Sequence, residues 1–365
     1  MIPLLKPTLP RLSSVQSKLR DVFKTGLLSN ENYVREFEKK SAKFLKAKNI
    51  VAVSNGTSGL VLAIKCLGLK GEVILPSFTF TSGGHSLLWC GLTPVFADID
   101  GKTFNIDPDS IEKKITNKTS AIMPTHVFGS PCDIDKIQRI AKKHSLKVIY
   151  DAAQAFGSKY KDKSMANFGD AVVFSLTPTK VLTAAEGGLI SVKDKKLANM
   201  MRLGRNNGDS FNRNEEFLGI TARMNELSAI LGIEGLKILP KVLKARLERV
   251  KLYKKELGNI PGIYFQQIPN SQFSVYKDLT ILIDEKKFGK SRDELLKELL
   301  KNDIQTKVYF YPPLHKKKVY RKYKKTYLPN TDSVSKQIMN LPLYSHMPEK
   351  DIIKVCSVVK KMYKK

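Results

Sequence analysis

The sequence has few cysteines and no long apolar run, and both absences narrow the class of protein. The four cysteines lie far apart and form no CxxC pair, so neither a disulfide framework nor a zinc site is indicated. No uninterrupted apolar stretch approaches the roughly 20 residues of a membrane span. The first residues, MIPLLKPTLPRL, lack the apolar core and cleavage site of a signal peptide. We therefore expect a cytoplasmic protein without a metal ion.

Acidic residues are scarce relative to basic ones. The chain has 63 lysine and arginine residues against 34 aspartate and glutamate residues, a formal net charge of +29. Such a charge suits nucleic acid, anionic lipid or an acidic small molecule. The lysines are spread along the whole chain, however, which is typical of a solvated surface. We expect neither nucleic acid nor a membrane as a partner, and keep a basic regulatory or nucleic-acid-binding protein as an alternative.

Short apolar runs alternate with helical patterns over the first 240 residues. Two helices are predicted first, over 11–24, with Gly26 as the stop, and over about 34–45. Continuous apolar runs are typical of strands buried on both faces, and hence of parallel sheets. The prediction is an α/β domain with a mostly parallel seven-stranded sheet flanked by helices. Its strands are expected at IVAV (50–53), EVILP (72–76), TPVFAD (93–98), SAIMPT (120–125), KVIYD (147–151), AVVFS (171–175) and GLISV (188–192).

The pattern changes after about residue 240. A long amphipathic helix is predicted over 239–256, and two more helices over 291–302 and at the C-terminus. Strand-like runs lie between them, which makes an α+β pattern. We predict a large domain with an N-terminal segment over 1–240 and a smaller C-terminal domain over 241–365, packed together. The strand-like runs are IYFQQI (263–268), KDLTILI (277–283) and QTKVYFY (305–311).

Three features follow predicted strands, at the edge where open α/β sheets bind ligands. Residues 54–59 (SNGTSG) open a helix, whose free N–H groups and dipole suit a phosphate; a plain N-cap is the alternative. The turn is neither a Walker loop nor GxGxxG. Asp151 ends the run KVIY, where it either meets a buried partner or caps the next helix. Lys180 comes five residues after Ser175 and just before Glu186-Gly187-Gly188.

Together, the three features are the protein groups that pyridoxal 5'-phosphate needs. A carboxylate beside the pyridine nitrogen keeps this nitrogen protonated, so that the ring acts as an electron sink. A lysine with a lowered pKa holds the cofactor's aldehyde as a Schiff base. The same lysine, once released, is placed to move a proton between the substrate's Cα and the cofactor's C4′. The sequence therefore predicts a pyridoxal phosphate enzyme.

Blocks of sequence along nearly the whole chain resemble one enzyme family. They include VAVSNGTSGLVLAI, PSFTFTSGGHSLLWCGLTPVFADID, VIYDAAQAFGS, FSLTPTKVLTAAEGG and LPLYSHMPEKDI. In this order they resemble the DegT-type nucleotide-sugar aminotransferases, pyridoxal phosphate enzymes of aspartate aminotransferase fold (fold type I). The resemblance implies Lys180 as the Schiff-base lysine and Asp151 as the partner of the pyridine nitrogen. The other implied cofactor contacts are Gly56, Thr57 and Ser175 to the phosphate, Gln154 to the ring's 3-oxygen and Phe80 stacked on the ring, with a core phenylalanine as the alternative for Phe80.

Some positions depart from the family pattern or have open roles. Thr221 stands where the family often has an asparagine that contacts the neighbouring subunit's phosphate, and Leu176-Thr177 replace the residues usual before the lysine motif's proline. Glu186 lies in the family's EGG turn without an assigned role. His85 and His126 match family blocks and are either functional or packed histidines. Candidates for the substrate's diphosphate or carboxylate are Arg202, Arg205 and Arg223, each with a structural ion pair as the alternative. His315 is a further candidate for binding the substrate, with a packed histidine as the alternative.

The resemblance implies a ping-pong aminotransferase of amino-sugar and polysaccharide biosynthesis, with aldimine and pyridoxamine forms of its cofactor. The amino group comes from glutamate, which leaves as 2-oxoglutarate, and goes to a keto-deoxysugar linked to a nucleoside diphosphate. A homodimer with shared active sites is implied as well. Some members carry histidine instead of the lysine and dehydrate sugars; Lys180 favours transamination, and a sugar dehydratase stays as an alternative. The sugar, nucleotide, keto position and stereochemistry are left open.

Overall fold

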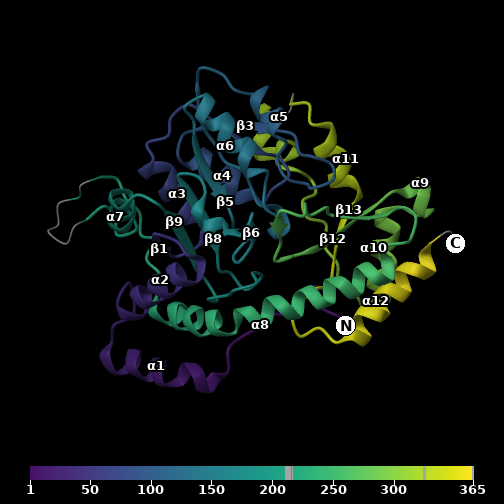
Figure 1. The fold of residues 1–365 in the computed structure, drawn as a ribbon, viewed down its shortest axis with the longest axis horizontal. Helices are drawn as coiled ribbons and strands as arrows, with labels where there is room; N and C mark the ends of the chain where they lie inside the picture. The colour runs from purple at the N-terminus through teal and green to yellow at the C-terminus, as the bar shows by residue number, and fades with distance from the viewer. Residues whose placement is uncertain (210–214, 216, 324–325, 364–365) are drawn as a thin grey trace.

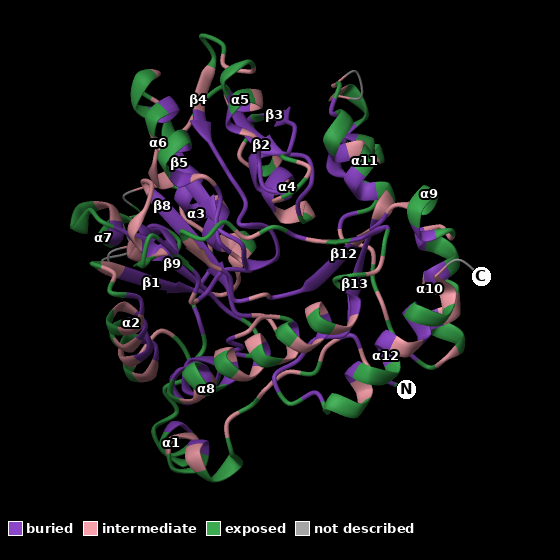
Figure 2. Ribbon diagram, turned by 45° about the vertical axis from the view of Figure 1, so that its right-hand side comes forward, coloured by how far each residue is buried: buried purple, intermediate pink, exposed green. Residues whose placement is uncertain are grey.

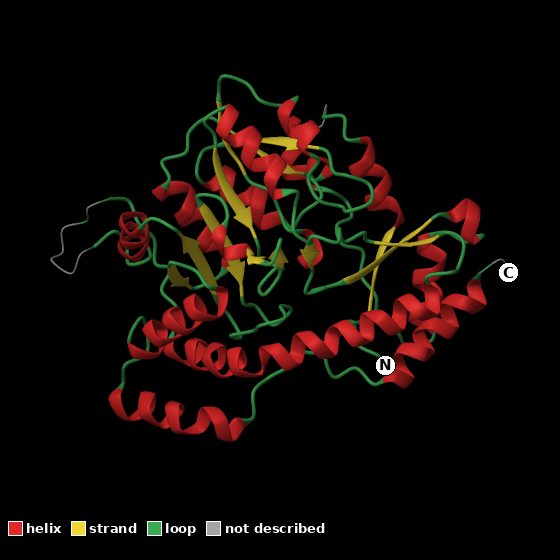
Figure 3. Cartoon of the chain, in the orientation of Figure 1, coloured by secondary structure: helices red, strands yellow, loops and turns green. Residues whose placement is uncertain are grey.

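The computed structural model describes residues 1–209, 215, 217–323 and 326–363. Its centre is a seven-stranded sheet between helices (Figures 1 and 3), so the predicted α/β architecture is confirmed. All seven predicted runs are strands of this sheet. In chain order they are β1 (Asn49–Val53), β2 (Glu72–Pro76), β3 (Thr93–Ala97), β4 (Thr119–Ile122), β5 (Lys147–Asp151), β8 (Ala171–Ser175) and β9 (Gly188–Val192).

The order of the strands brings the predicted site features to one edge. The sheet runs β1-β9-β8-β5-β4-β2-β3 and is parallel except for β9, which pairs antiparallel with both β1 and β8. Val53, at the end of β1, and Ser175, at the end of β8, both pair with Gly188, the first residue of β9. Asp151, at the end of β5, pairs with Val173 of β8. The turn after β1, Asp151 and the loop that carries Lys180 therefore start at the same edge.

Helices cover both faces of the sheet, and the strands between them are buried (Figure 2). Along β1, Ile50 and Ala52 face one hydrophobic cluster, whereas Val51 and Val53 face another. The first predicted helix ends as expected, because Gly26 adopts φ 70° and donates its N–H to Val22 O. The helices of this part are α1 (Leu12–Thr25), α2 (Asn32–Leu45), α3 (Gly56–Cys66), α4 (Thr81–Trp89), α5 (Pro108–Glu112), α6 (Ile134–Lys143) and α7 (Lys195–Gly204).

A long helix, α8 (Glu226–Leu257), runs below the sheet toward the C-terminal part (Figure 1). The predicted start at residue 239 is wrong. Asn225 caps the helix by accepting the N–H of Ser228, and Pro240 lies inside it. Residue 240 is thus in the middle of one helix that contacts α1, α2 and α12 (Glu349–Met362). The division into domains at 240/241 stays a prediction.

The C-terminal part has its own antiparallel sheet, in the order β10 (Ile263–Phe265), β12 (Leu279–Ile283) and β13 (Ile338–Leu341). The predicted strand at 305–311 is wrong, because this segment makes only an isolated bridge, from Lys307 to Asn340. Ile2 packs into the same C-terminal core. The remaining helices are α9 (Glu285–Phe288), α10 (Arg292–Lys301) and α11 (Pro329–Gln337).

Smaller elements complete the fold. A second three-stranded sheet consists of β6 (Lys159–Tyr160), β7 (Lys163–Ser164) and β11 (Gln272–Phe273), with β6 in the middle. In the described part of the chain, 3-10 helices span Val127–Gly129, Met165–Asn167, Leu314–Lys316 and Lys318–Tyr323. Among the described residues, no helix combines the length and apolar character needed to cross a membrane. Within the same residues, no cluster of three or more His, Cys, Asp or Glu is arranged to hold a metal ion.

Candidate active site

The turn after β1 forms an anion-binding helix start. Asn55 Oδ1 accepts the N–H and the hydroxyl of Ser58, at 2.8 and 3.1 Å, and so begins α3. The N–H groups of Gly56 and Thr57 lie in the first helical turn, where such groups lack intrahelical partners and attract anions. A Cβ at Gly56 would lie 3.1 Å from Ser175 Cβ, so the turn and the end of β8 touch. Gly56, Thr57 and Ser175 line one cavity.

Asp151 lies at the end of β5 with its carboxyl group buried beside the same cavity. Its Oδ1 accepts the N–H of Ala153 at 3.0 Å. Burial raises the pKa of the Asp151 carboxyl, against the effects of this hydrogen bond and of the positive charge of Lys180. No helix follows β5 directly. Asp151 therefore holds a short turn and keeps a carboxyl group available to a cationic partner in the cavity.

Lys180 follows β8 in a turn in which its N–H donates to Thr177 O at 3.0 Å. Its side chain reaches the cavity, where burial and the neighbouring positive charge of Lys277 lower the amine's pKa from 10.5 to about 8. At pH 7 about a tenth of the Lys180 amines are then neutral, instead of fewer than about one in a thousand. Lys180 thus differs from a surface lysine in having a usable nucleophilic form.

The cavity has a volume of about 280 Å³ and is lined by residues from both parts of the chain. Phe80, at the start of α4, is 57 % exposed and presents its ring there, so it is not a core phenylalanine. Gln154 accepts the N–H of Phe128 with Oε1 at 2.5 Å, which leaves its NH₂ group to donate. The other lining residues are Asn55, Leu60, Thr79, Ser82, Thr125, Ala153, Val173, Thr177, Thr179, Lys277, Tyr309 and Phe310.

These groups fit pyridoxal 5'-phosphate. The free N–H groups at the start of α3 and the Ser175 hydroxyl suit its phosphate. The buried Asp151 carboxyl suits a protonated pyridine nitrogen, because a buried carboxylate needs a cationic partner. Lys180 offers the partly neutral amine that its aldehyde requires. The structure thus brings together all seven residues predicted to contact the cofactor from within one subunit.

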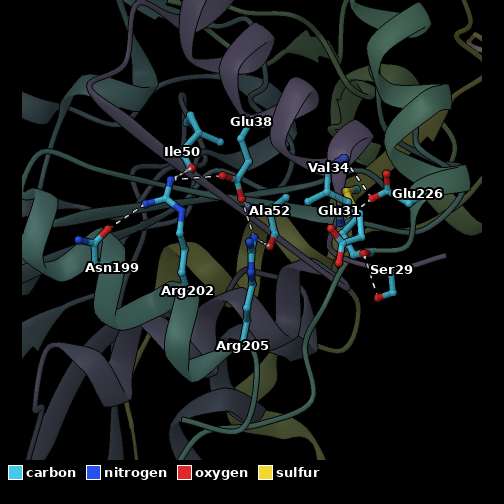
Figure 4. Close-up of polar contacts among 11 residues, drawn as sticks. Ser29, Glu31, Val34, Glu38, Ile50, Ala52, Asn199, Arg202, Arg205 and Glu226 are labelled. Atoms are coloured by element: carbon cyan, nitrogen blue, oxygen red, sulfur yellow. Dashed lines mark hydrogen bonds and ion pairs between the residues drawn. The ribbon is translucent and has the colours of Figure 1, made fainter. Parts of the chain in front are cut away.

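Two predicted substrate-binding arginines are used in the ion pair with Glu38 that Figure 4 shows. Arg205 is only 4 % exposed and donates to Glu38 Oε1 at 2.5 Å and to Ala52 O at 2.6 Å. Arg202 donates to Glu38 Oε2 at 3.2 Å and to Ile50 O at 3.0 Å. Both guanidinium groups hold α7 to β1 and α2 and do not line the cavity. For both arginines the structure thus contains the structural ion pair that the sequence analysis gave as the alternative to substrate binding.

The other predicted positions also lie outside the residues that line the cavity. Thr221 and Arg223 are exposed and donate to Asn207 Oδ1 at 2.9 Å and Asn206 Oδ1 at 3.2 Å. His315 is buried, with Nδ1 2.7 Å from Ser77 Oγ. Its Nε2 lies 3.3 Å from an Asp332 carboxylate oxygen, and burial lowers its pKa.

His85, His126 and Glu186, which the sequence analysis also singled out, lie outside the residues that line the cavity as well. His85 stacks on Tyr320 with ring centroids 5.9 Å apart, and His126 on Tyr150 at 4.9 Å. His126 is fully buried, which lowers its pKa to about 3. His126 is therefore a packed histidine, and the half-buried His85 lies against Tyr320. Glu186 is exposed.

Sequence reasoning missed a second lysine in the cavity. Lys277 Nζ lies 2.9 Å from Asp278 Oδ1, and both side chains are buried. The pair stands directly before the apolar run LTILI of β12. Charged residues next to a buried strand had singled out Asp151, and the same signal applies here. Tyr309 and Phe310 were missed because their segment was predicted to be a strand.

A fold and a cavity of this kind fit a pyridoxal phosphate-dependent enzyme. Residues 13–360 match the DegT/DnrJ/EryC1/StrS aminotransferase family, and the chain belongs to this family. The family match covers nearly the whole sequence, in agreement with the ordered blocks from which the resemblance was inferred.

Two relatives and one solved structure illustrate the match. GDP-perosamine synthase of Vibrio cholerae is 32 % identical over 370 residues, covering 100 % of this chain and 99 % of its own. The dTDP-4-amino-4,6-dideoxy-D-glucose transaminase of Escherichia coli is 34 % identical, covering 98 % of both chains. The crystal structure of DesI in the presence of its TDP-sugar product has a TM-score of 0.94 and 33 % identity, covering 99 % of this chain and 93 % of its own. The predictions of the family, of a pyridoxal phosphate enzyme and of a nucleotide-sugar aminotransferase are confirmed.

Proposed function

We propose that the enzyme moves the amino group of glutamate onto the keto group of a deoxysugar that is linked to a nucleoside diphosphate. The relatives support the sugar part, since one is a dTDP-4-amino-4,6-dideoxy-D-glucose transaminase and DesI was crystallised with a TDP-sugar product. The observation that carries the proposal is that Lys180 and Asp151 share one cavity with the start of α3.

The chain's residues would hold the cofactor at three points. The N–H groups of Gly56 and Thr57, with the Ser175 hydroxyl, bind its phosphate. Asp151 holds a proton on its pyridine nitrogen, because the buried carboxylate is stabilised by this positive charge. When bound, pyridoxal phosphate supplies an electron sink for the bonds at the substrate's amine-bearing carbon.

Two further residues orient the ring, and one moves the proton. Phe80 would face the ring, and the NH₂ group of Gln154 would donate to its 3-oxygen. Lys180 would hold the cofactor's aldehyde through its partly neutral amine and, as a free amine, would move a proton at the substrate's Cα. A pKa of about 8 suits this task, since a base works best with a pKa near the operating pH.

The test is to purify the protein, add glutamate and follow the visible spectrum. We expect conversion of the cofactor to its pyridoxamine form with release of 2-oxoglutarate. The pyridoxal form should return when one member of a panel of dTDP-, UDP- and GDP-linked keto sugars is added. An amino sugar among the products supports the proposal, and a dehydrated sugar without nitrogen contradicts it.

A pair of lysine variants tests the role of Lys180. Lys180→Ala should lose both the lysine-bound cofactor spectrum and the turnover. Lys193→Ala is the matched control, because Lys193 also follows a buried strand, β9, but is exposed. Full activity of Lys180→Ala would exclude it as the catalytic lysine.

The remaining predictions need their own measurements. Glutamate as the donor is tested by replacing it with other amino acids, and the homodimer by light scattering. Thr221 is exposed on this chain, which is compatible with a contact to a second subunit; a crystal structure of the dimer would test it. The cytoplasmic location stays a prediction.

A further inference from the structure

A buried ion pair lies on the side of the cavity formed by the C-terminal part. Lys277 Nζ is 2.9 and 3.0 Å from the two carboxylate oxygens of Asp278, and the side chains are only 4 % and 6 % exposed. The pair is made by neighbouring residues just before β12. Buried pairs are costly to desolvate, and apolar residues often replace them without loss of stability. Stability alone therefore does not explain the pair.

Lys277 is held in place by contacts beyond Asp278. The buried guanidinium of Arg246, on α8, donates to Tyr276 O at 2.5 Å and to Lys277 O at 2.9 Å, which fixes the backbone on both sides. The ammonium group also lies 5.6 Å from the centre of the Tyr309 ring. A lysine normally has much side-chain freedom, and these contacts restrict it here.

Lys277 and Lys180 line the same cavity and also a second, small cavity of about 20 Å³ beside it. Burial and, after it, the positive charge of Lys277 lower the pKa of the Lys180 amine, whereas the negative charges of Asp278 and Asp151 raise this pKa by less. The Asp278 carboxylate thus does not cancel the effect of the Lys277 ammonium group on the pKa of Lys180. The charged and titratable groups that face Lys180 in the two cavities are Lys6, Asp151, Arg246, Lys277, Tyr309 and Tyr344, with Asp278 behind Lys277.

We propose that Lys277, fixed by Asp278 and Arg246, is a positioning residue that keeps part of the Lys180 amine neutral and so sets the pH range in which Lys180 binds the cofactor's aldehyde. A second cation beside a reactive lysine disfavours the ammonium form of that lysine. The proposal rests on the role of Lys180 in the proposed function. It concerns only the proton on Lys180 Nζ and requires no contact between Lys277 and the cofactor.

The test measures covalent binding of pyridoxal 5'-phosphate to the full-length apoprotein. Binding consumes the neutral amine, forms a C=N bond and releases the aldehyde oxygen as water, so its rate rises with pH through the pKa of Lys180. We expect the wild-type midpoint near pH 8. Lys277→Met should move it up by about one pH unit, which slows binding about tenfold at pH 7.

Two further variants control for charge and for folding. Lys277→Arg keeps a cation and should leave the midpoint near that of the wild type. The double variant Lys277→Met/Asp278→Asn avoids a buried carboxylate without a partner, and its midpoint should also rise, by less than in the single variant. Thermal unfolding of each apoprotein identifies a variant that has lost its fold.

Three outcomes would overturn the proposal. The first is a Lys277→Met midpoint equal to the wild type's in a folded protein. In the second, the midpoint of Lys277→Met is again unchanged, and only the glutamate concentration that converts half of the cofactor to its pyridoxamine form rises. This result would make Lys277 a substrate-binding residue. In the third, the wild type forms no lysine-bound spectrum at all. This result would refute the proposed function too, so the failures of the two proposals are distinguishable.

Discussion

Gly188, the last residue of the EGG turn, packs directly on the start of the phosphate-binding helix. A Cβ at this position would lie 2.7 Å from the carbonyl carbon and oxygen of Asn55 and 2.9 Å from the nitrogen of Gly56. All three are backbone atoms, which no rotamer change moves away. We therefore predict that Gly188→Ala displaces the turn that holds the cofactor's phosphate.

The size of the effect follows from these distances. Ordinary contact begins at 3.4 Å, so the gaps of 2.9 and 2.7 Å require a shift of about 0.5–0.7 Å. Overpacking of this kind costs about 1–3 kcal/mol. If this cost falls mainly on the turn, the affinity for pyridoxal 5'-phosphate drops about 5- to 150-fold, since about 1.4 kcal/mol corresponds to tenfold.

The assay is a titration of each apoprotein with pyridoxal 5'-phosphate, together with urea unfolding. Gly101→Ala is the matched control: a Cβ there would meet only Asn330 Oδ1, at 4.0 Å, and should change neither quantity. At Gly187 a Cβ would meet the flexible end of Met224, so Gly187→Ala should cost less than Gly188→Ala. Wild-type affinity and stability in Gly188→Ala would refute the reasoning.

Two other predictions concern buried charges. Glu38→Ala leaves the buried Arg205 without its carboxylate, so unfolding by urea should show a loss of about 3–5 kcal/mol; Glu36→Ala, on the same helix but in an exposed pair with Lys40, should cost under about 1 kcal/mol, and equal losses would contradict the prediction. Lys180 has a pKa of about 8 in the folded apoprotein and 10.5 when unfolded, so burying its charge costs stability below pH 8, and this cost disappears as the pH rises from 8 to 10.5. Lys180→Met should therefore be more stable than the wild-type apoprotein at pH 7, by about 2–3 kcal/mol, and lose this advantage near pH 10.5; a difference independent of pH would show that it has another origin.

The strands of the large sheet were predictable because burial on both faces leaves a continuous apolar run in the sequence. The start of α8 was not. The predicted helix began at residue 239, whereas the true cap is Asn225 and Pro240 lies inside the helix. The run at 305–311 has the aromatic and β-branched residues of a strand, but Tyr309 and Phe310 face the cavity instead. An apolar composition indicates that a side chain is buried, but it does not indicate which residues surround that side chain.

The site followed a similar division between local and long-range signals. Asp151 and Lys180 were found because their positions after strands are local features of the sequence. The partners of Arg202 and Arg205 were not predictable: Glu38 is 164 and 167 residues away, and only the packing of α2 and α7 on β1 brings them together. Lys277 stands directly before the apolar run of β12, a local signal that was overlooked among so many lysines, but its burial beside Asp278 is visible only in the structure.

The cavity joins the two parts of the chain into one functional unit. The first 240 residues contain Lys180, Asp151 and the phosphate-binding turn, but Lys277, Tyr309 and Phe310 come from the C-terminal part. Burial and Lys277 are the two effects that lower the pKa of Lys180, and the second comes from the C-terminal part. The reactivity of the lysine is thus a property of the assembled chain rather than of its motif. A predicted boundary at residue 240 would cut α8, whose Arg246 holds the backbone at Lys277, and would separate Lys180 from the charge that tunes it.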